Sequence, residues 1–437
     1  MPTADGGSRH AYARPVSAAV QESRLAVVGI GYAGLPLAVA AAAHGYRTCG
    51  LDISSQVVDQ VRSGISPVDT VSAGELRSVR DRFEATDDPG RLTDCSVIVV
   101  CVPTPLDAQG RPDLGPLTSA ARTVRDHLRA GQLVVVESTT YPGTTDSVIK
   151  PILEQSGLRA GLDFNLAFSS ERVDPGNPQY QLHNTPKVVG GLTPVCSARA
   201  KAFYSGLVQQ VYLTRGMREA EASKILENTF RQVNIALVNE FAQLCHELGI
   251  DIWDTIQAAE TKPFGFTGFR PSAGVGGHCI PVDPMYFVHC VRELGLSFRM
   301  AESAHSVNSG MPQWIAQRVR KILADTYTAA RGRAQVLLLG ITYKKDIADV
   351  RNSPAKEVAR LLIAEGIRVS FHDPYVTELA VDGKRMVCVS DVDQAVRAAD
   401  LVVIAQRHKD YGDDLLSKAK QIFNACGPAD LPNVVQL

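Results

Sequence analysis

Short apolar runs that end at glycine or at a polar residue recur near both ends of the chain. Residues 24–29 and 47–51 are two such runs near the start, and 335–340 is one near the end. Stretches with helical spacing follow such runs; one is 353–365, which comes after the run at 335–340 and which Gly366 ends. Buried runs of this length that alternate with helices predict parallel strands in doubly wound α/β sheets.

The middle of the chain has a different pattern. From 219 to 248 there is no Gly or Pro, and apolar residues recur at helical spacing: Ile225, Phe230, Val233, Leu237, Phe241 and Leu244. This predicts one helix of about 30 residues, long for a globular protein, that could bridge domains and pack against a second copy. The segment 262–284 is rich in Gly, Pro and Phe. We expect a long loop there, which is often functional.

These patterns predict the fold class and the domains. We expect an α/β protein with two Rossmann-like doubly wound domains, joined by the long central helix and a helical middle domain. The expected divisions are a disordered leader at 1–22, a first nucleotide-binding domain at 23–212, a helical middle at 213–310 and a second such domain at 311–437.

Composition and charge exclude several function classes. The chain has 45 Lys and Arg against 46 Asp and Glu, so no global field favours nucleic acid or an anionic membrane. No apolar run approaches the length of a membrane span. Nine cysteines, with scattered spacing and no CxxC, favour a reducing cytoplasm.

A glycine fingerprint follows the first predicted strand. Gly29, Gly31 and Gly34 have GxGxxG spacing at the start of a predicted helix, and Asp52 follows at the end of the next strand. The glycines permit a tight turn, the approach of a pyrophosphate and close packing of helix on strand. Asp52 is placed to accept hydrogen bonds from a ribose, which favours NAD. The alternative is a purely structural turn.

One cysteine stands in a glycine-rich run. Cys279 follows Gly276 and Gly277, which we expect to leave the backbone open to a ligand, and Asp283 lies four residues on. A nicotinamide cofactor and a nucleophilic thiol together indicate oxidation of an aldehyde through a thioester. The alternative for Cys279 is a buried structural thiol. A metal site with His278 lacks a second Cys/His pair, so we expect no metal.

Other polar residues have both a functional and a structural interpretation. Lys224, Asn228 and Arg231 share one face of the long helix, which is either a solvated face or a functional one. Glu171 follows a predicted strand and either takes part in chemistry or caps a turn.

A basic segment follows the apolar run at 335–340. Lys344, Lys345 and Arg351 form either a solvated basic loop or the phosphate-binding end of a nucleotide fold.

Together these residues resemble the UDP-glucose/GDP-mannose dehydrogenase family over roughly 24–425. The resemblance rests on six motifs in the family's order, at 29–35, 102–105, 138–145, 224–228, 276–283 and 344–353. It implies an NAD-dependent, four-electron oxidation of a sugar C6 alcohol to a carboxylate, with two NAD used in turn. It also implies NAD binding at 23–212, dimerisation and the reactive cysteine at 213–310, and UDP-sugar binding at 311–437.

The resemblance assigns roles to particular residues. Cys279 would be the nucleophile, Lys224 and Asn228 would stabilise an oxyanion, Asp283 would position water, and Glu171 would assist thioester hydrolysis. The hydroxyl of Thr139 would help to hold that water. The implied cofactor contacts are Gly29, Gly31, Tyr32, Ala33, Gly34, Asp52, Thr104, Thr139 and Arg351. The implied substrate contacts are Glu171, Arg172, Lys224, Asn228, Arg231, Phe266, Gly276 and Lys344.

The substrate branch is indicated by the residues around the cysteine. His278 and Val282, with the stretches 227–240 and 262–266, resemble the branch that acts on UDP-N-acetylhexosamines. The stretch 171–178 resembles that branch too, and indicates UDP-N-acetylglucosamine more than UDP-N-acetylmannosamine. UDP-glucose is a further alternative. Either Arg172 or Arg231 could reach an N-acetyl carbonyl or a pyrophosphate.

Two positions depart from the family pattern. Ser170 replaces the usual proline before Glu171, and Pro175 stands where the glucose branch has a second carboxylate, so hydrolysis would rely on Glu171 or on Asp174.

Two other function classes are alternatives to the interpretation as a nucleotide-sugar dehydrogenase. A single-step 3-hydroxyacid-type dehydrogenase shares the long helix and a lysine–asparagine pair but needs no cysteine. A non-catalytic nucleotide sensor would not need Cys279, Lys224 and Asp283 together. We also expect a homodimer through the long helix.

Overall fold

The computed structural model describes residues 24–107, 109–174, 176–177, 179–326, 334–429, 431 and 433–437. The leader expected at 1–22 and Pro175 lie outside these ranges. The described residues form two compact units, divided within the long helix between Lys224 and Ile225, with residues 109–111 grouped with the second unit. The finer division with boundaries at 212 and 310 stays a prediction.

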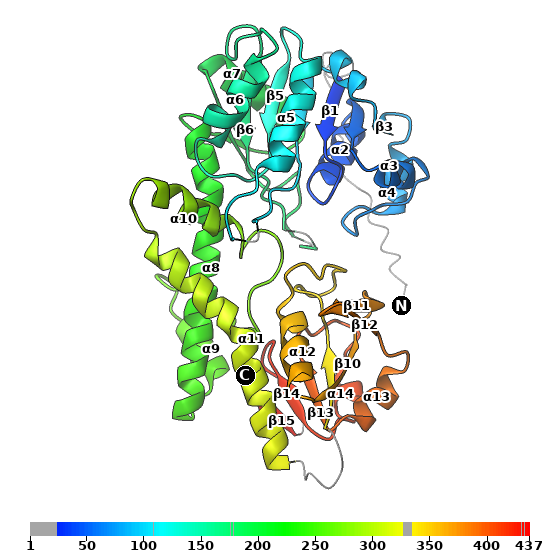
Figure 1. The fold of residues 1–437 in the computed structure, drawn as a ribbon, viewed down its shortest axis with the longest axis vertical. Helices are drawn as coiled ribbons and strands as arrows, with labels where there is room; N and C mark the ends of the chain where they lie inside the picture. Colours follow the sequence, from blue (N-terminus) through cyan, green and yellow to red (C-terminus); the bar gives the residue numbers. More distant parts are fainter. Residues whose placement is uncertain are drawn as a thin grey trace, which may run out of the picture. The chain divides into compact units, whose positions relative to one another are not determined.

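The first unit contains a sheet with strand order β3-β2-β1-β4-β5-β6-β7-β8 (Figure 1). Its strands are β1 (Arg24–Val28), β2 (Arg47–Leu51), β3 (Phe83–Thr86), β4 (Val97–Val100), β5 (Leu133–Val136), β6 (Asn165–Ser169), β7 (Lys187–Gly191) and β8 (Val211–Leu213). Its helices are α2 (Gly34–Ala43), α3 (Ser55–Arg62), α4 (Ala73–Ser78), η1 (Pro89–Asp94), α5 (Gly115–His127), η2 (Thr145–Ile149), α6 (Lys150–Glu154) and α7 (Pro194–Ser205).

Alternating residues of the strands face two different cores. On β1, Leu25 and Val27 pack with residues of α2 and α7, whereas Ala26 and Val28 pack with residues of α5 and α6. Because side chains alternate across a strand, an all-apolar strand must have helices on both faces of its sheet. The expected doubly wound sheet is therefore confirmed.

One strand of this sheet departs from the parallel pattern. β7 runs antiparallel to β6, with Ser169 paired to Val189, while the other neighbouring strands are parallel. The reversal brings the first residue of β7, Lys187, to the edge where β5 and β6 end. A strand's direction depends on its pairing in space, and the apolar run at 187–191 contains no signal for it.

The long helix α8 (Met217–Leu248) confirms the predicted helix of about 30 residues. Its first residues anchor it to the first unit. Glu221 is fully buried and accepts hydrogen bonds from the backbone N–H groups of Gly143 and Thr145, at 2.5 and 2.9 Å. The hydroxyl of Thr145 donates to the same carboxylate at 2.7 Å.

The second unit contains a parallel sheet with order β10-β9-β13-β14-β15, and a separate hairpin of β11 and β12 (Figure 1). Its strands are β9 (Gln335–Leu339), β10 (Arg368–His372), β11 (Glu378–Val381), β12 (Lys384–Val387), β13 (Leu401–Ile404), β14 (Ile422–Asn424) and β15 (Val434–Gln436). Its helices are the rest of α8, α9 (Ile252–Glu260), α10 (Asp283–Glu293), α11 (Arg299–Thr326), α12 (Pro354–Ala364), α13 (Val392–Ala398) and α14 (Asp413–Leu416).

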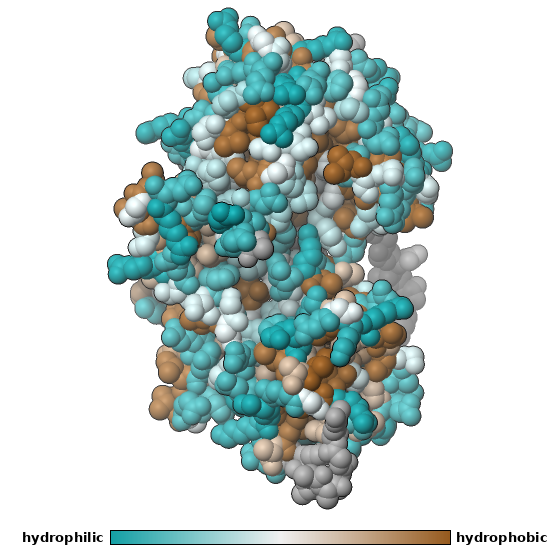
Figure 2. Space-filling view, in the orientation of Figure 1, coloured by the Kyte–Doolittle hydropathy of each residue, from teal (hydrophilic) through white to brown (hydrophobic). Residues whose placement is uncertain are grey.

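The second sheet is also covered on both faces. Val336 and Leu338 of β9 pack in the core that includes α11 and α12, and Leu337 and Leu339 pack with α13 and α14. On the face drawn in Figure 2, hydrophobic residues lie in small groups among hydrophilic ones. In the described part of the chain, no helix is both long and apolar enough to cross a membrane.

A buried polar network ties the loop before Cys279 to two helices of the second unit. Asn239 on α8 is fully buried, accepts from the backbone N–H of Ser272 at 2.8 Å, and donates to the side-chain oxygen of Asn308 on α11 at 2.9 Å. Asn308 donates in turn to the carbonyl of Gln232 at 3.1 Å. Such a network is stabilising only when all of its members are satisfied.

We expect Asn239→Ala to lower the free energy of unfolding of the second unit by about 1–3 kcal/mol, because it leaves buried partners without hydrogen bonds. Both tryptophans, Trp253 and Trp314, lie in this unit, so fluorescence during urea denaturation reports on it. Asn234→Ala is the control, since Asn234 donates only to the carbonyl of Phe230 on its own helix. Equal effects of the two substitutions would contradict the role of the network.

Candidate functional site

The glycine-rich turn after β1 has the geometry that a dinucleotide requires. Gly29 has φ +90, and a Cβ on Gly34 would lie 1.9 Å from the Gly29 carbonyl oxygen, so these two positions accept only glycine. A Cβ on Gly31 would meet no atom within 4 Å, which leaves open space above the backbone. No side chain caps the N-terminus of α2, so its first N–H groups are suited to phosphate oxygens.

Asp52 lies beside this turn, at the end of β2. One of its carboxylate oxygens accepts from the backbone N–H of Ile30 at 3.0 Å, and the other accepts from that of Ser54 at 2.9 Å. These bonds hold the carboxylate next to the glycine turn. Its expected bond to a ribose stays a prediction.

The Cys279 loop packs against the loop that follows β9. A Cβ on Gly276 would lie 2.4 Å from Cβ of Tyr343, and one on Gly277 would lie 2.9 Å from the Tyr343 ring. The backbone N–H of Gly277 donates to the Arg351 carbonyl at 2.9 Å. The Tyr343 side chain therefore fills the side of the two glycines on which a Cβ would stand. Gly276 is half-buried, and the approach of a ligand to its backbone stays a prediction.

Cys279 itself is exposed, so the structure does not support the alternative of a buried structural thiol. Its carbonyl accepts from the backbone N–H of Asp283 at 2.8 Å, which places the thiol one turn before α10. The neighbouring His278 is partly buried, and burial together with the charge of Arg351 lowers its pKa below the usual value. His278 is therefore neutral at physiological pH.

Two of the predicted catalytic residues meet within the second unit. Asp283, the first residue of α10, is 1% exposed, and its carboxylate accepts from the side-chain amide of Asn228 at 2.5 Å. Asn228 is 9% exposed on α8, one turn after the similarly buried Lys224. The interpretation of Lys224 and Asn228 as a solvated face is wrong, whereas Arg231 is exposed.

Glu171 lies in a buried charged cluster of the first unit. One of its oxygens accepts from the backbone N–H of Val173 at 2.6 Å, and the other lies 3.3 Å from the ammonium of Lys187. Burial raises its pKa, but the charge of Lys187, the Val173 N–H and the charge of Lys224 outweigh burial and leave the pKa below the usual value. Glu171 is therefore anionic at neutral pH.

Sequence reasoning missed two members of this cluster. Lys187 also lies 2.7 Å from Glu137, whose side chain is fully buried at the end of β5. Glu137 follows an apolar run at a strand end, the same signal that singled out Glu171. Lys187 gave no such signal, because it is the first residue of an apolar run and only the reversed direction of β7 brings it to the site.

The other predicted residues lie on several loops. Thr139 is half-buried after β5, Thr104 is buried after β4, and Tyr32 and Ala33 are half-buried in the glycine turn. The guanidinium of Arg172 donates to the carbonyl of Pro186 at 2.7 Å.

In the second unit, Arg351 pairs with Asp349 at 2.6 Å, Lys344 is half-buried, and Phe266 is 39% exposed. The structure thus places Lys344 and Arg351 on a structured loop that contacts the cysteine loop. It does not decide their expected ligands.

The chain matches three models of one protein family along most of its length. These are the NAD binding domain of the UDP-glucose/GDP-mannose dehydrogenase family at 23–208, the central domain at 218–310 and the UDP binding domain at 337–436. The chain belongs to the UDP-glucose/GDP-mannose dehydrogenase family. It is therefore an NAD-dependent dehydrogenase of nucleotide sugars, as the motifs predict, and the glycine turn on β1 fits the cofactor.

Several family members of known name resemble the chain over nearly its full length. The UDP-N-acetyl-D-glucosamine 6-dehydrogenase of Pseudomonas aeruginosa is 35% identical over 90% of this chain and 92% of its own. The UDP-N-acetyl-D-mannosamine dehydrogenase of Pyrococcus horikoshii is 34% identical over 89% of this chain and 90% of its own.

Solved structures of the family share the fold. The UDP-D-ManNAc dehydrogenase of Pyrococcus horikoshii superposes with a TM-score of 0.84 at 32% identity, over 94% of this chain and 98% of that one. A UDP-glucose dehydrogenase of Pyrobaculum islandicum gives a TM-score of 0.86 at 26% identity, over 96% and 98%.

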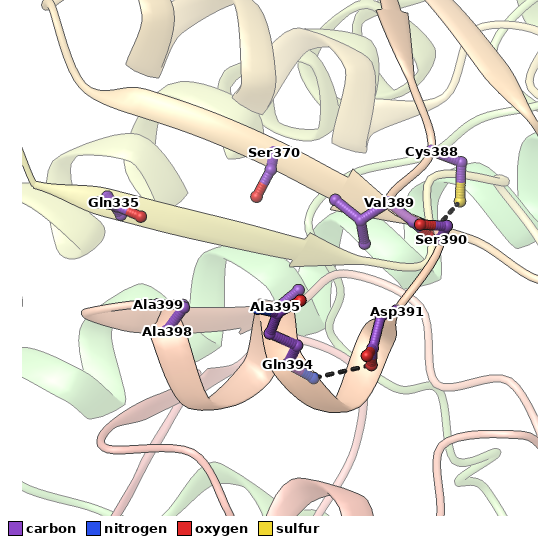
Figure 3. Close-up of a pocket in the computed structure, with 10 residues that line it drawn as sticks. All are labelled: Gln335, Ser370, Cys388, Val389, Ser390, Asp391, Gln394, Ala395, Ala398 and Ala399. Atoms are coloured by element: carbon purple, nitrogen blue, oxygen red, sulfur yellow. Dashed lines mark hydrogen bonds between the residues drawn. The ribbon is translucent and has the colours of Figure 1, made fainter.

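A pocket of about 460 Å³ in the second unit is separate from these residues. It lies between β9, β10 and α13, and its lining includes Gln335, Ser370 and Gln394 (Figure 3). None of the predicted site residues lines it. In the described residues, no group of three or more His, Cys, Asp or Glu could hold a metal ion.

We expect Cys279 to react fastest with a maleimide or iodoacetamide reagent in the native protein, because the other eight thiols are buried or half-buried. Burial raises the pKa of Cys49 to about 12 and that of Cys95 to about 11, so neither forms thiolate at pH 8. Peptide mass spectrometry after brief labelling identifies the site, and urea-unfolded protein is the control. Faster labelling of any other cysteine would contradict this prediction.

Proposed function

We propose that the protein oxidises the C6 hydroxyl of a UDP-hexose, UDP-N-acetylglucosamine in the first place, to the uronic acid through a thioester on Cys279. One observation supports this proposal above the others: an exposed thiol one turn before Asp283, whose buried carboxylate bonds to Asn228. A dehydrogenase that stops at a ketone or an aldehyde needs no such thiol.

Bound NAD supplies the hydride acceptor for both oxidations. After the first oxidation, the Cys279 thiolate attacks C6 of the aldehyde; a C–S bond forms and the carbonyl oxygen becomes an oxyanion. Lys224 and Asn228 stabilise that oxyanion as the thiohemiacetal forms. Loss of a second hydride from C6 then gives the thioester, a loss that a free aldehyde cannot undergo directly.

Hydrolysis completes the reaction. A water oxygen attacks the thioester carbonyl, the C–S bond breaks, and the thiolate of Cys279 leaves. The proton of the water passes to Glu171, which is anionic at neutral pH and therefore able to accept it. Thr139 holds the water, and Asp283 takes part in the proton transfers. The donors on its two oxygens hold Glu171 in one orientation, and we assign it, in preference to Asp174, as this base.

Substrate and cofactor contacts follow from the resemblance. Lys344 contacts the UDP-sugar, and Arg351 reaches the NAD phosphates. Phe266 and Gly276 contribute to the sugar site. Either Arg172 or Arg231 contacts the N-acetyl carbonyl or the pyrophosphate. The exposure of Arg231 favours it for a ligand, since Arg172 already donates to a backbone carbonyl.

The choice of sugar rests on the residues beside the cysteine. His278 and Val282 match the UDP-N-acetylhexosamine branch, and the relatives that resemble this chain are named for UDP-N-acetylglucosamine and UDP-N-acetylmannosamine. Related sugars can be distinguished by one or two hydrogen-bonding groups. UDP-N-acetylmannosamine and UDP-glucose are the alternative substrates.

We expect two NADH per UDP-N-acetylglucosamine consumed, with the uronic acid as product, because the alcohol is oxidised first to the aldehyde and then, as the thiohemiacetal on Cys279, to the thioester. Absorbance at the NADH band against product mass measures the ratio, with UDP-N-acetylmannosamine and UDP-glucose assayed in parallel. Cys279→Ser should lose full turnover.

A ratio of one, or full turnover by Cys279→Ser, would reject the thioester scheme in favour of a single-step dehydrogenase. Activity only on UDP-N-acetylmannosamine or UDP-glucose would show that the proposed substrate is wrong, but it would not contradict the thioester mechanism.

We further propose that the protein is a homodimer through α8. Six large apolar residues are exposed on this helix: Leu226, Phe230, Leu237, Phe241, Leu244 and Leu248. At 100° per residue they fall in one narrow stripe, since their spacings are combinations of three, four and seven. A long apolar stripe on a helix is typical of a contact with another helix, and a twofold axis would place two copies of it face to face.

We expect Leu237→Glu combined with Phe241→Glu to halve the mass of the particle in solution, because each charge would be buried in the contact. Sedimentation or light scattering measures the mass. Glu247→Ala is the control, since Glu247 is exposed on α8 outside the stripe. A parent chain that is monomeric at micromolar concentration would refute the dimer.

A further inference from the structure

The first unit buries two carboxylates around one ammonium. The Lys187 side chain is 3% exposed, with Glu137, fully buried, 2.7 Å away and Glu171, 20% exposed, 3.3 Å away. Removing three charges from water is costly, and a well-packed apolar group is often as stabilising as a buried ion pair. A cluster of this kind beside a reacting carboxylate therefore calls for a role beyond holding strands together.

We propose that Lys187 is a positioning residue for Glu171, and that Glu137 in turn holds the ammonium of Lys187. This inference rests on the proposed function, in which Glu171 accepts the proton of water during thioester hydrolysis. In this proposal, Lys187 and Glu137 set the orientation and the charge of Glu171 without contacting the substrate themselves.

Geometry gives the first argument. The antiparallel β7 starts where β5 and β6 end, so Lys187 lies between the residues that follow those two strands. Glu171 has a donor on each oxygen, the N–H of Val173 on one and the ammonium on the other. Each carboxylate oxygen retains a second lone pair, so the carboxylate is fixed in rotation and still able to accept from water.

The far end of the cluster is fixed as well. The Tyr204 hydroxyl, from α7, donates to the Glu137 carboxylate at 2.5 Å, and the Cys101 thiol lies 3.6 Å from its other oxygen. The ammonium of Lys187 also lies 5.2 Å from the centre of the Tyr204 ring. Glu137 thus has donors on three sides, and it holds the ammonium within reach of Glu171.

Charge gives the second argument. The groups that act on Glu171 are Lys187, Glu137 and Lys224, with Tyr204 and Cys101 behind them. Burial raises the pKa of Tyr204 and of Cys101 well above their usual values, so both stay neutral. Burial raises the pKa of Glu171, and the repulsion between Glu171 and Glu137 acts in the same direction. The charge of Lys187, the N–H of Val173 and the charge of Lys224 lower the pKa and outweigh both.

The two residues of the cluster have opposite effects on the base. Hydrolysis slows at low pH as Glu171 becomes protonated, and we call this part of the pH profile the acid limb. Replacing Lys187 with methionine removes a positive charge and raises the pKa of Glu171, so the acid limb moves to higher pH. Replacing Glu137 with glutamine removes a negative charge in the same shape, so the limb moves to lower pH. A purely structural ion pair would lower stability in both variants and move neither limb.

The test measures hydrolysis of the enzyme-bound thioester as a function of pH, after a rapid supply of NAD and UDP-N-acetylglucosamine. Mass spectrometry of the quenched enzyme follows the covalent adduct on Cys279. In Lys187→Met we expect about tenfold or greater accumulation of the adduct, and an acid limb about one pH unit higher. In Glu137→Gln we expect a limb at lower pH. Lys150→Met, which breaks a partly exposed pair with Glu154, should match the parent.

The inference would be overturned if the acid limbs of both variants lay at the same pH as that of the parent protein. If Lys187→Met does not fold, as thermal unfolding shows, Glu137→Gln decides alone, because it keeps the shape of the side chain. A parent that forms no adduct with any UDP-sugar rejects the proposed function, and the inference with it. A parent that forms the adduct while the limbs stay fixed rejects only the inference.

Discussion

The ion pair between Lys187 and Glu137 joins the ends of three neighbouring strands in the first unit. A buried ammonium must be matched by carboxylates at hydrogen-bonding distance, so the ends of β5 and β6 and the start of β7 are held in register around it. The ion pair thereby fixes the part of the sheet's carboxyl edge that carries Glu171. Another part of the same edge is fixed by the glycine turn between β1 and α2, where Gly34 packs so closely on the Gly29 carbonyl that a Cβ would overlap it.

Parallel strands bring chemically active residues from distant parts of the chain to one edge of a sheet. Asp52, Glu137 and Glu171 each follow a different strand of the first unit, and each has its carboxylate held by donors from neighbouring segments. In the second unit the same principle acts on loops, since the Cys279 loop packs on the loop after β9.

Glycines in this chain serve two different purposes that look alike in sequence. Gly31 has open space above it, as a cofactor-binding turn requires. Gly276 lies against Cβ of Tyr343 and Gly277 against the Tyr343 ring, so they permit close packing of one loop on another. The pattern of residues alone cannot separate these purposes, because the difference lies in which distant side chain fills the space.

The amino-acid sequence was sufficient to predict the class of fold, a helix at about 219–248, the dinucleotide turn, the family and Cys279 as the reactive thiol. These depend on local periodicity and on motifs whose chemistry is short-range, such as a glycine turn before a helix. Tertiary structure decided the direction of β7, and with it the place of Lys187, because strand direction is set by pairing between distant segments. It also decided that Asp283 bonds to Asn228, 55 residues away, since a buried carboxylate takes its partner from whichever element packs against it.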